Sequence, residues 1–329
     1  MAEYINIRGQ SIEVVASDPA NPTLGQIWYN STSNTLKGEN FGTASWATGG
    51  NLGTGRYNLG GSGEQTAALA YGGYTGTAGS SATEEYNGTS WTGGGTFPYV
   101  AVNVRGTGIQ TATLAVGGWT GTPPFNTNTS SYDGSTWTTV GNYPKGILNI
   151  GISGTTTAGL GAGGYSSPGI YNNDTHEFNG STWTASGNLI QTTNAGIIAG
   201  TQTDSIAFTG ASSPPFYLIT TTDAYDGSTW TTLPATTTQG VWVSAGSGNS
   251  ASALWYGGEG TPPYTTVSNL YDGTSWASDA NLPTGVQAHA GHSPTTSTAI
   301  SFGGKAPSPT TATNEYNAAG PITKTITAS

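Results

Sequence analysis

The stretch YDGSTW occurs at residues 132–137 and again, letter for letter, at residues 225–230. Close variants are YNGTSW at 86–91, FNGSTW at 178–183 and YDGTSW at 271–276. Asn-Gly and Asp-Gly tolerate positive φ and are the strongest short-range signal for a β-hairpin turn. Each copy therefore predicts two antiparallel strands, the first ending at an aromatic residue and the second beginning at a tryptophan.

Three rows of residues repeat with one period along the chain. Tryptophans recur at spacings of 45, 46, 46, 47 and 46 residues, at Trp46, Trp91, Trp137, Trp183, Trp230 and Trp276. Glycines that end short apolar runs recur at spacings of 45, 46, 46, 48 and 46, at Gly73, Gly118, Gly164, Gly210, Gly258 and Gly304. The third row is aromatic, at Tyr86, Tyr132, Phe178, Tyr225, Tyr271 and Tyr316. A fixed period of this size is typical of solenoids and propellers.

Each repeat reads as four short strands: a small-residue strand, an apolar strand ending at the glycine, a strand ending at the aromatic residue, and a strand beginning at the tryptophan. Four strands in about 46 residues is the pattern of a propeller blade. The order Gly117–Gly118, Tyr132, Trp137 and Pro144 resembles kelch repeats. The fourth repeat departs from that pattern, with Thr209–Gly210 in place of the glycine pair. We therefore expect an all-β fold, a six-bladed kelch-like β-propeller.

The ends of the repeat array suggest how the ring closes. Trp46 precedes the first glycine of its row, and the last glycine repeat, ending at Tyr316, has no tryptophan after it. We expect residues 38–52 to complete the last blade, within a propeller of residues 38–329 preceded by an attachment segment of residues 1–37. The alternative is that the C-terminal stretch ITKTITAS supplies the missing strand.

The residues before the repeats carry a different signal. The stretch at 17–38, SDPANPTLGQIWYNSTSNTLKG, has a predicted hairpin over IWYN–STSN–TLKG. It resembles a segment found near the N-termini of tail-fibre and other virion proteins of tailed phages, especially marine ones. The matching residues are Asp18, Pro19, Asn21, Pro22, Gly25, Gln26, Trp28, Tyr29, Asn30, Thr32, Ser33, Thr35, Leu36 and Lys37. The resemblance implies a virion part that binds other virion proteins through residues 1–37; an ordinary β-rich leader is the alternative.

Composition excludes several classes of function. Seven Lys and Arg against seventeen Asp and Glu give a net charge of −10, which argues against a nucleic-acid partner. The absence of cysteine rules out disulfides and thiolate-bound metals. The N-terminus lacks the pattern of a signal peptide, and no apolar run approaches the ~20 residues that span a bilayer. We expect a protein made in the host cytoplasm and carried on the virion, without a cofactor and without membrane insertion.

No catalytic set stands out. Asp133, Asp226 and Asp272 occupy turn positions that hold Asn87 and Asn179 in sister repeats, so turn formation explains them better than acid–base chemistry. His289 and His292 are three apart on a predicted strand and should point to opposite faces, which disfavours a joint metal site. Asn58, Asn103, Asn149 and Asn194 recur on the predicted innermost strands and could line a central channel. We therefore predict no catalytic and no metal-binding residues.

The loops after the glycine row are the most irregular part of the repeat, and all should emerge on one face. Three of them contain a Pro-Pro-aromatic stretch: Pro123–Pro124–Phe125, Pro214–Pro215–Phe216 and Pro262–Pro263–Tyr264. Proline stiffens a loop, and an aromatic ring on it can contact a glycan or a protein. Our leading hypothesis is a non-enzymatic tail-fibre or receptor-binding protein that uses these loops for host attachment. The alternatives are a structural head-decoration or neck or tail adaptor protein, or a polysaccharide-acting enzyme; homo-oligomerisation stays open.

Overall fold

The computed structural model describes residues 12–23, 25–167 and 169–326. The chain divides into two compact units. Residues up to Ala44 and from Ala318 onward form one, which we call the terminal unit, and Ser45–Asn317 form the other, which we call the repeat domain. Within the described residues, no helix is long and apolar enough to cross a membrane.

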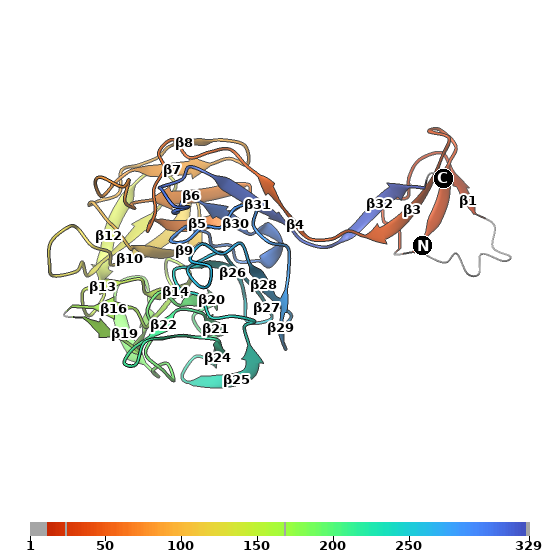
Figure 1. Cartoon of the computed structure of the whole chain (residues 1–329). Coiled ribbons are helices and arrows are strands. Elements are labelled where there is room, and N and C mark those ends of the chain that lie inside the picture. The colour runs from red at the N-terminus through yellow and green to blue at the C-terminus, as the bar shows by residue number, and fades with distance from the viewer. Residues whose placement is uncertain (1–11, 24, 168, 327–329) are drawn as a thin grey trace. The chain divides into compact units, whose positions relative to one another are not determined.

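The terminal unit is one four-stranded sheet in the order β1-β2-β3-β32. Its strands are β1 (Glu13–Val15), β2 (Ile27–Asn30), β3 (Thr35–Phe41) and β32 (Pro321–Thr325). β1 runs parallel to β2, whereas the other pairs are antiparallel. Figure 1 shows β32, from the end of the chain, lying beside β3 from its beginning.

Asp18 organises the terminal unit. Its Oδ1 accepts hydrogen bonds from the indole Nε1 of Trp28 at 3.0 Å and from Nδ2 of Asn30 at 2.8 Å. Its Oδ2 pairs with Lys37 Nζ at 2.6 Å. Trp28 is fully buried, so its N–H needs an internal partner. All four residues are among those in the stretch at 17–38 that carry its resemblance to virion proteins.

The repeat domain is all-β and propeller-like. Its described residues form five four-stranded antiparallel sheets and a three-stranded one along the chain, together with two small sheets whose strands are two residues long. The four-stranded sheets are β5 (Gly60–Glu64), β6 (Ala67–Tyr71), β7 (Thr83–Tyr86), β8 (Trp91–Gly93); β9 (Arg105–Ile109), β10 (Ala112–Val116), β11 (Asn128–Tyr132), β12 (Trp137–Asn142); β14 (Gly151–Gly154), β15 (Gly159–Ala162), β18 (Thr175–Phe178), β19 (Trp183–Ser186); β20 (Ile197–Gly200), β21 (Ser205–Phe208), β24 (Thr221–Tyr225), β25 (Trp230–Thr236); and β26 (Ala245–Asn249), β27 (Ser252–Tyr256), β28 (Ser268–Tyr271), β29 (Trp276–Ser278).

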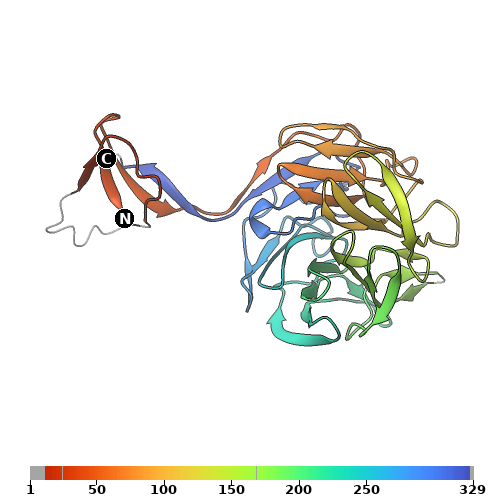
Figure 2. The ribbon, with the colours of Figure 1, turned by 180° about the vertical axis from the view of Figure 1, so that it is seen from behind.

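The three-stranded sheet consists of β30 (Ile300–Phe302), β31 (Thr313–Asn317) and β4 (Ser45–Thr48). The smaller elements are β13 (Ile147–Leu148), β16 (Tyr165–Ser166), β17 (Ile170–Tyr171), β22 (Ala211–Ser212), β23 (Tyr217–Leu218) and the 3-10 helix η1 (Thr296–Thr298). The first strands of successive sheets, β5, β9, β14, β20 and β26, lie side by side around the centre of the domain. Figure 2 shows the same succession of sheets from behind.

The domain boundaries differ from those the repeats suggest. β4, with Trp46, pairs antiparallel with β31, so residues 45–48 do supply the strand that the last repeat lacks. Residues 38–41, however, belong to β3 of the terminal unit. The tail strand β32 also belongs to the terminal unit, whereas the sequence predicts it within the propeller of residues 38–329. The reason is that β3 is long enough to pair with β2 over its first half and with β32 over its second. Residues 1–11 and 24 of the predicted attachment segment and 327–329 of the tail lie outside the described residues.

The tryptophan row joins neighbouring sheets. Each indole packs on the aromatic residue of its own hairpin, as in the pair Tyr225 and Trp230, whose ring centroids are 4.9 Å apart. Each of five indoles also donates from Nε1 to a threonine hydroxyl of the preceding sheet at 2.7–3.0 Å. These pairs are Trp91–Thr313, Trp137–Thr83, Trp183–Thr129, Trp230–Thr175 and Trp276–Thr222. The hydrophobic core is accordingly divided into clusters between successive sheets.

Candidate functional site

A row of left-handed residues surrounds the centre of the repeat domain, one at the start of each repeat's innermost segment. Their φ angles lie between 48° and 60°, and they are Asn58, Asn103, Asn149, Ala195, Val243 and Ala288. Five backbone hydrogen bonds of 2.7–3.1 Å connect them, with N–H donating to C=O: Asn58 to Ala288, Asn103 to Asn58, Asn149 to Asn103, Ala195 to Asn149 and Ala288 to Val243. Because Asn58 bonds to Ala288, the first and last repeats meet here.

This central ring corrects one detail of the sequence interpretation. Asn58, Asn103 and Asn149 do lie at the channel, but the fourth member is Ala195 and not Asn194. Asparagine is enriched at positive φ because its short side chain tolerates this conformation. In the later repeats the conformation persists without asparagine, so the backbone bonds of the ring hold it there.

A pocket of about 210 Å³, which we call the mouth pocket, opens at the central ring. It is lined by Tyr57, Asn58, Asn103, Asn149, Trp242, Val243, Glu259, Gln287, Ala288 and Lys305. These residues come from the segments just before the innermost strands and from the loops after the glycine row. Sequence analysis identified the asparagines but missed the other members, which share no common residue type from repeat to repeat.

Three lining residues carry a buried polar atom that has no hydrogen-bond partner among the described residues. They are the acceptors Asn149 Oδ1 and Gln287 Oε1 and the donor Trp242 Nε1. A buried polar group without a partner costs about 1–3 kcal/mol, so native proteins rarely leave several together. Surrounding protein covers these three atoms, so the groups that face a molecule in the mouth pocket are the partly exposed polar side chains of its lining, such as Glu259 and Lys305.

The pocket also contains charge and aromatic surface. Glu259 and Lys305 line it from the loops of two consecutive repeats, and Lys305 Nζ lies 5.7 Å from the ring centroid of Tyr57. Each of these three side chains is only partly buried. The arrangement presents one cation, one anion and a ring face, which suits a polar ligand with both hydroxyl and carbon–hydrogen surface.

The three predicted recognition loops differ in the exposure and contacts of their aromatic residues. Phe216 is 57% exposed at the tip of the β22–β23 hairpin, and its ring lies 6.4 Å from that of Trp242 in the mouth pocket. Phe125 is half-buried, 6.0 Å from the ring of Tyr165 in the next repeat, and Tyr264 is half-buried as well. The adjoining prolines, Pro123, Pro124, Pro214, Pro215, Pro262 and Pro263, are all exposed. The structure therefore brings the Pro214–Phe216 tip next to Trp242 of the pocket.

The acids of the turns are engaged in local hydrogen bonds. Asp133 Oδ1 accepts from the backbone N–H groups of Thr136 at 2.7 Å and of Ser135 at 2.9 Å. These bonds lower the pKa of Asp133 to about 2. Asp226 and Asp272 make the equivalent bonds, and so do Asn87 and Asn179 through their amide oxygens.

The histidines do not converge. His289 is fully buried beside Tyr256, with ring centroids 5.7 Å apart, whereas His292 borders the channel and its Nε2 lies 3.2 Å from Thr107 Oγ1. Among the residues that the structure describes, no group of three or more His, Asp or Glu side chains is placed to hold a metal ion.

Comparison with known proteins supports the fold. No family model matches the chain, and no curated protein matches it. Among solved structures, YjhT is similar, with a TM-score of 0.67 and 12% sequence identity over 83% of this chain and 99% of the YjhT chain. The chain shares the fold of YjhT. At this identity the similarity concerns the fold alone.

Proposed function

We propose that this chain is a non-enzymatic virion protein of a tailed phage, a tail-fibre or receptor-binding component. In this proposal the repeat domain is a six-bladed kelch-like β-propeller that binds the host surface. The terminal unit attaches it to other virion proteins. The ligand is a host-surface glycan bound in the mouth pocket.

The mouth pocket is the observation that carries the proposal. A sugar hydroxyl both donates and accepts hydrogen bonds. It can therefore bond to both the acceptor carboxylate of Glu259 and the donor ammonium of Lys305, which line the pocket and are partly exposed. Pockets of this kind, with a few convergent polar groups beside aromatic rings, are the default binding-site hypothesis in a protein of unknown function.

The terminal unit supports the virion part of the proposal. The segment at 17–38 resembles the N-terminal region of phage virion proteins, and its residues Asp18, Trp28, Asn30 and Lys37 form one bonded cluster. This cluster stabilises a small sheet that is compact by itself. A separate sheet of this kind suits an attachment module.

The number of acidic side chains at the mouth pocket, and the hydrogen bonds of the others, favour a binding protein over a hydrolase. Hydrolysis of glycosidic bonds generally uses a pair of carboxyl groups flanking the bond. Glu259 is the one acid that lines the mouth pocket among the described residues, and the turn acids are occupied by their own backbone. A pocket with a single acid is suited to binding.

Gold-labelled antibodies on phage particles test the virion assignment. The antibodies are raised against this protein and applied to a lysate that contains it. Label at fibre or tail tips is expected. Label over the head or neck would favour the decoration or adaptor role, and unlabelled particles would contradict any virion role.

Glycan binding tests the pocket directly. Purified protein is applied to an array of bacterial-surface polysaccharides, alongside the variants Trp242→Phe and Gln287→Leu. Each variant changes the shape and polarity of one side chain in the pocket lining and should weaken binding about tenfold, as expected for the loss of roughly one hydrogen bond. Phe125→Ala, outside the mouth pocket, serves as the matched control and should bind normally. Binding that survives both pocket variants unchanged would contradict the assignment.

A further inference from the structure

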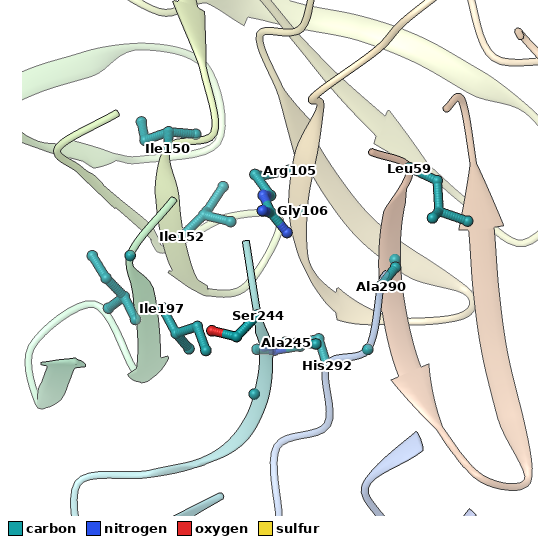
Figure 3. A pocket seen from close by; sticks show the side chains of 15 residues that line it. Leu59, Arg105, Gly106, Ile150, Ile152, Ile197, Ser244, Ala245, Ala290 and His292 are labelled. Atoms are coloured by element: carbon teal, nitrogen blue, oxygen red, sulfur yellow. The ribbon is translucent and has the colours of Figure 1, made fainter. Parts of the chain in front are cut away.

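A second, smaller cavity lies along the innermost strands, just past the central ring. It has a volume of about 50 Å³. Most of its wall is apolar, from Leu59, Ile150, Ile152, Ile197 and Ala290, as Figure 3 shows. Ser244, His292 and Arg105 supply its polar side chains.

Arg105 is the unusual member of this wall. It stands at the start of β9, two residues after Asn103 of the central ring, and its side chain reaches into the space between the strands (Figure 3). The side chain is partly exposed and lines the cavity. Within the described part of the chain, Arg105 forms no hydrogen bond and no ion pair.

Arg56 shows how the same protein treats a buried guanidinium elsewhere. Its Nη1 donates to the carbonyl oxygens of Gly72 and Ala82, both at 2.9 Å, and its Nη2 pairs with Glu84 at 2.7 Å. A charge taken out of water is tolerated when such partners replace the lost hydration. Arg105 has no counterpart to Glu84.

The neighbouring titratable groups do not supply a negative charge. They are Tyr71, His289 and His292. Burial lowers the pKa of His289 to about 3 and that of His292 to about 4, and burial raises the pKa of the Tyr71 hydroxyl. All three are therefore neutral at pH 7. Burial lowers the pKa of Arg105 to about 10, which leaves the guanidinium charged at that pH.

We propose that this cavity holds a small inorganic anion, of the size of chloride, bound to the Arg105 guanidinium. The guanidinium has no negatively charged neighbour in this wall, since no described residue of the wall is acidic. The volume limits the ligand, because one water needs about 10–15 Å³ of such space and the cavity therefore holds only a few atoms of that size. A single cation in an apolar wall favours a monovalent anion, since a second negative charge would be left unpaired.

Anion-dependent unfolding tests this site. The Tm of the whole protein is measured in sodium chloride, sodium bromide and sodium gluconate at equal ionic strength and pH 7. Gluconate is too large for the cavity. A ligand that binds only the folded state stabilises it in proportion to ln(1 + [L]/Kd). We expect the Tm to rise with chloride or bromide concentration and not with gluconate.

Two variants separate the cavity from general charge effects. Arg105→Leu should abolish the difference between chloride and gluconate, whereas Lys324→Gln, which removes an exposed positive charge of the terminal unit, should retain it. Equal Tm values for the unmodified protein in all three salts would overturn the proposal, and so would an unchanged halide effect in Arg105→Leu.

Bromide also gives a readout that does not depend on folding of a variant. Crystals of the unmodified protein soaked in sodium bromide should show an anomalous peak in the cavity beside Arg105. Bromide peaks confined to the protein surface would overturn the proposal. Neither experiment requires the glycan, so failure here and failure of the proposed function are distinguishable.

Discussion

The bond between Trp230 and Thr175 gives the sharpest test of how the sheets are held together. Trp230 Nε1 donates to Thr175 Oγ1 at 2.9 Å, and the two residues are 5% and 0% exposed. Thr175→Val keeps the shape of the side chain and removes the acceptor. The indole N–H is then buried without a partner, which should lower the free energy of unfolding by about 1–3 kcal/mol. For a domain of this size, each kcal/mol corresponds to a fall of roughly 2–4 °C in Tm.

A double-mutant cycle isolates this bond. Thr175→Val, Trp230→Phe and the double variant are unfolded in urea, and tryptophan fluorescence gives their free energies of unfolding. Trp230→Phe should cost more than Thr175→Val because it also loses buried ring area. The double variant should be more stable than the sum of the single effects predicts, by about 0.5–3 kcal/mol, as expected for residues in contact.

The control is Thr184→Val, an exposed threonine on β19 of the same sheet, which should change stability by less than about 0.5 kcal/mol. Additive effects of Thr175→Val and Trp230→Phe would refute the reasoning. In that case the tryptophan row would act through packing alone.

Three further predictions follow from the repeat. Thr313→Val should lower the free energy of unfolding as much as Thr175→Val does, because Trp91 Nε1 donates to Thr313 Oγ1 at 2.9 Å between the first and last sheets. A smaller effect in urea unfolding would mean that the first and last sheets are not bonded in this way. Gly117→Ala should lower Tm more than Gly121→Ala: both have positive φ, but an added Cβ at Gly117 lies 2.3 Å from the carbonyl oxygen of Ile147 and one at Gly121 meets nothing within 4 Å. Asp133→Asn should reduce acid sensitivity. Folding lowers the pKa of Asp133 from 3.8 to about 2, so the charged carboxylate stabilises the folded state at pH above 4. This contribution is lost as pH falls from 4 to 2, and the stability of Asp133→Asn should therefore change less over this range.

Much of the fold could be predicted because its determinants are local and repeated. The Asp-Gly and Asn-Gly turns hold their own backbone, as at Asp133, and any repeat shows the pattern by itself. The tryptophan and glycine rows mark the same position in each sheet, so their count also indicated that Trp46 belongs with the last repeat.

The pairing of the two chain ends could not be read in the same way. β32 and β3 are separated by most of the chain and belong to no repeat, so no second copy identifies their partners. Backbone pairing between strands so distant in sequence depends on the whole fold bringing them together.

The sequence by itself determined the repeat, its turns and the aromatic contacts between neighbouring sheets, because hydrogen bonds and packing over short distances fix each of them. The tertiary structure alone decided the mouth pocket and the Arg105 cavity. Their residues, such as Asn149, Trp242 and Gln287, differ in type at equivalent or adjoining positions of several repeats and meet only when the repeats surround a common centre. Whether a polar atom there finds a partner depends on every neighbour at once, and no single repeat contains that information.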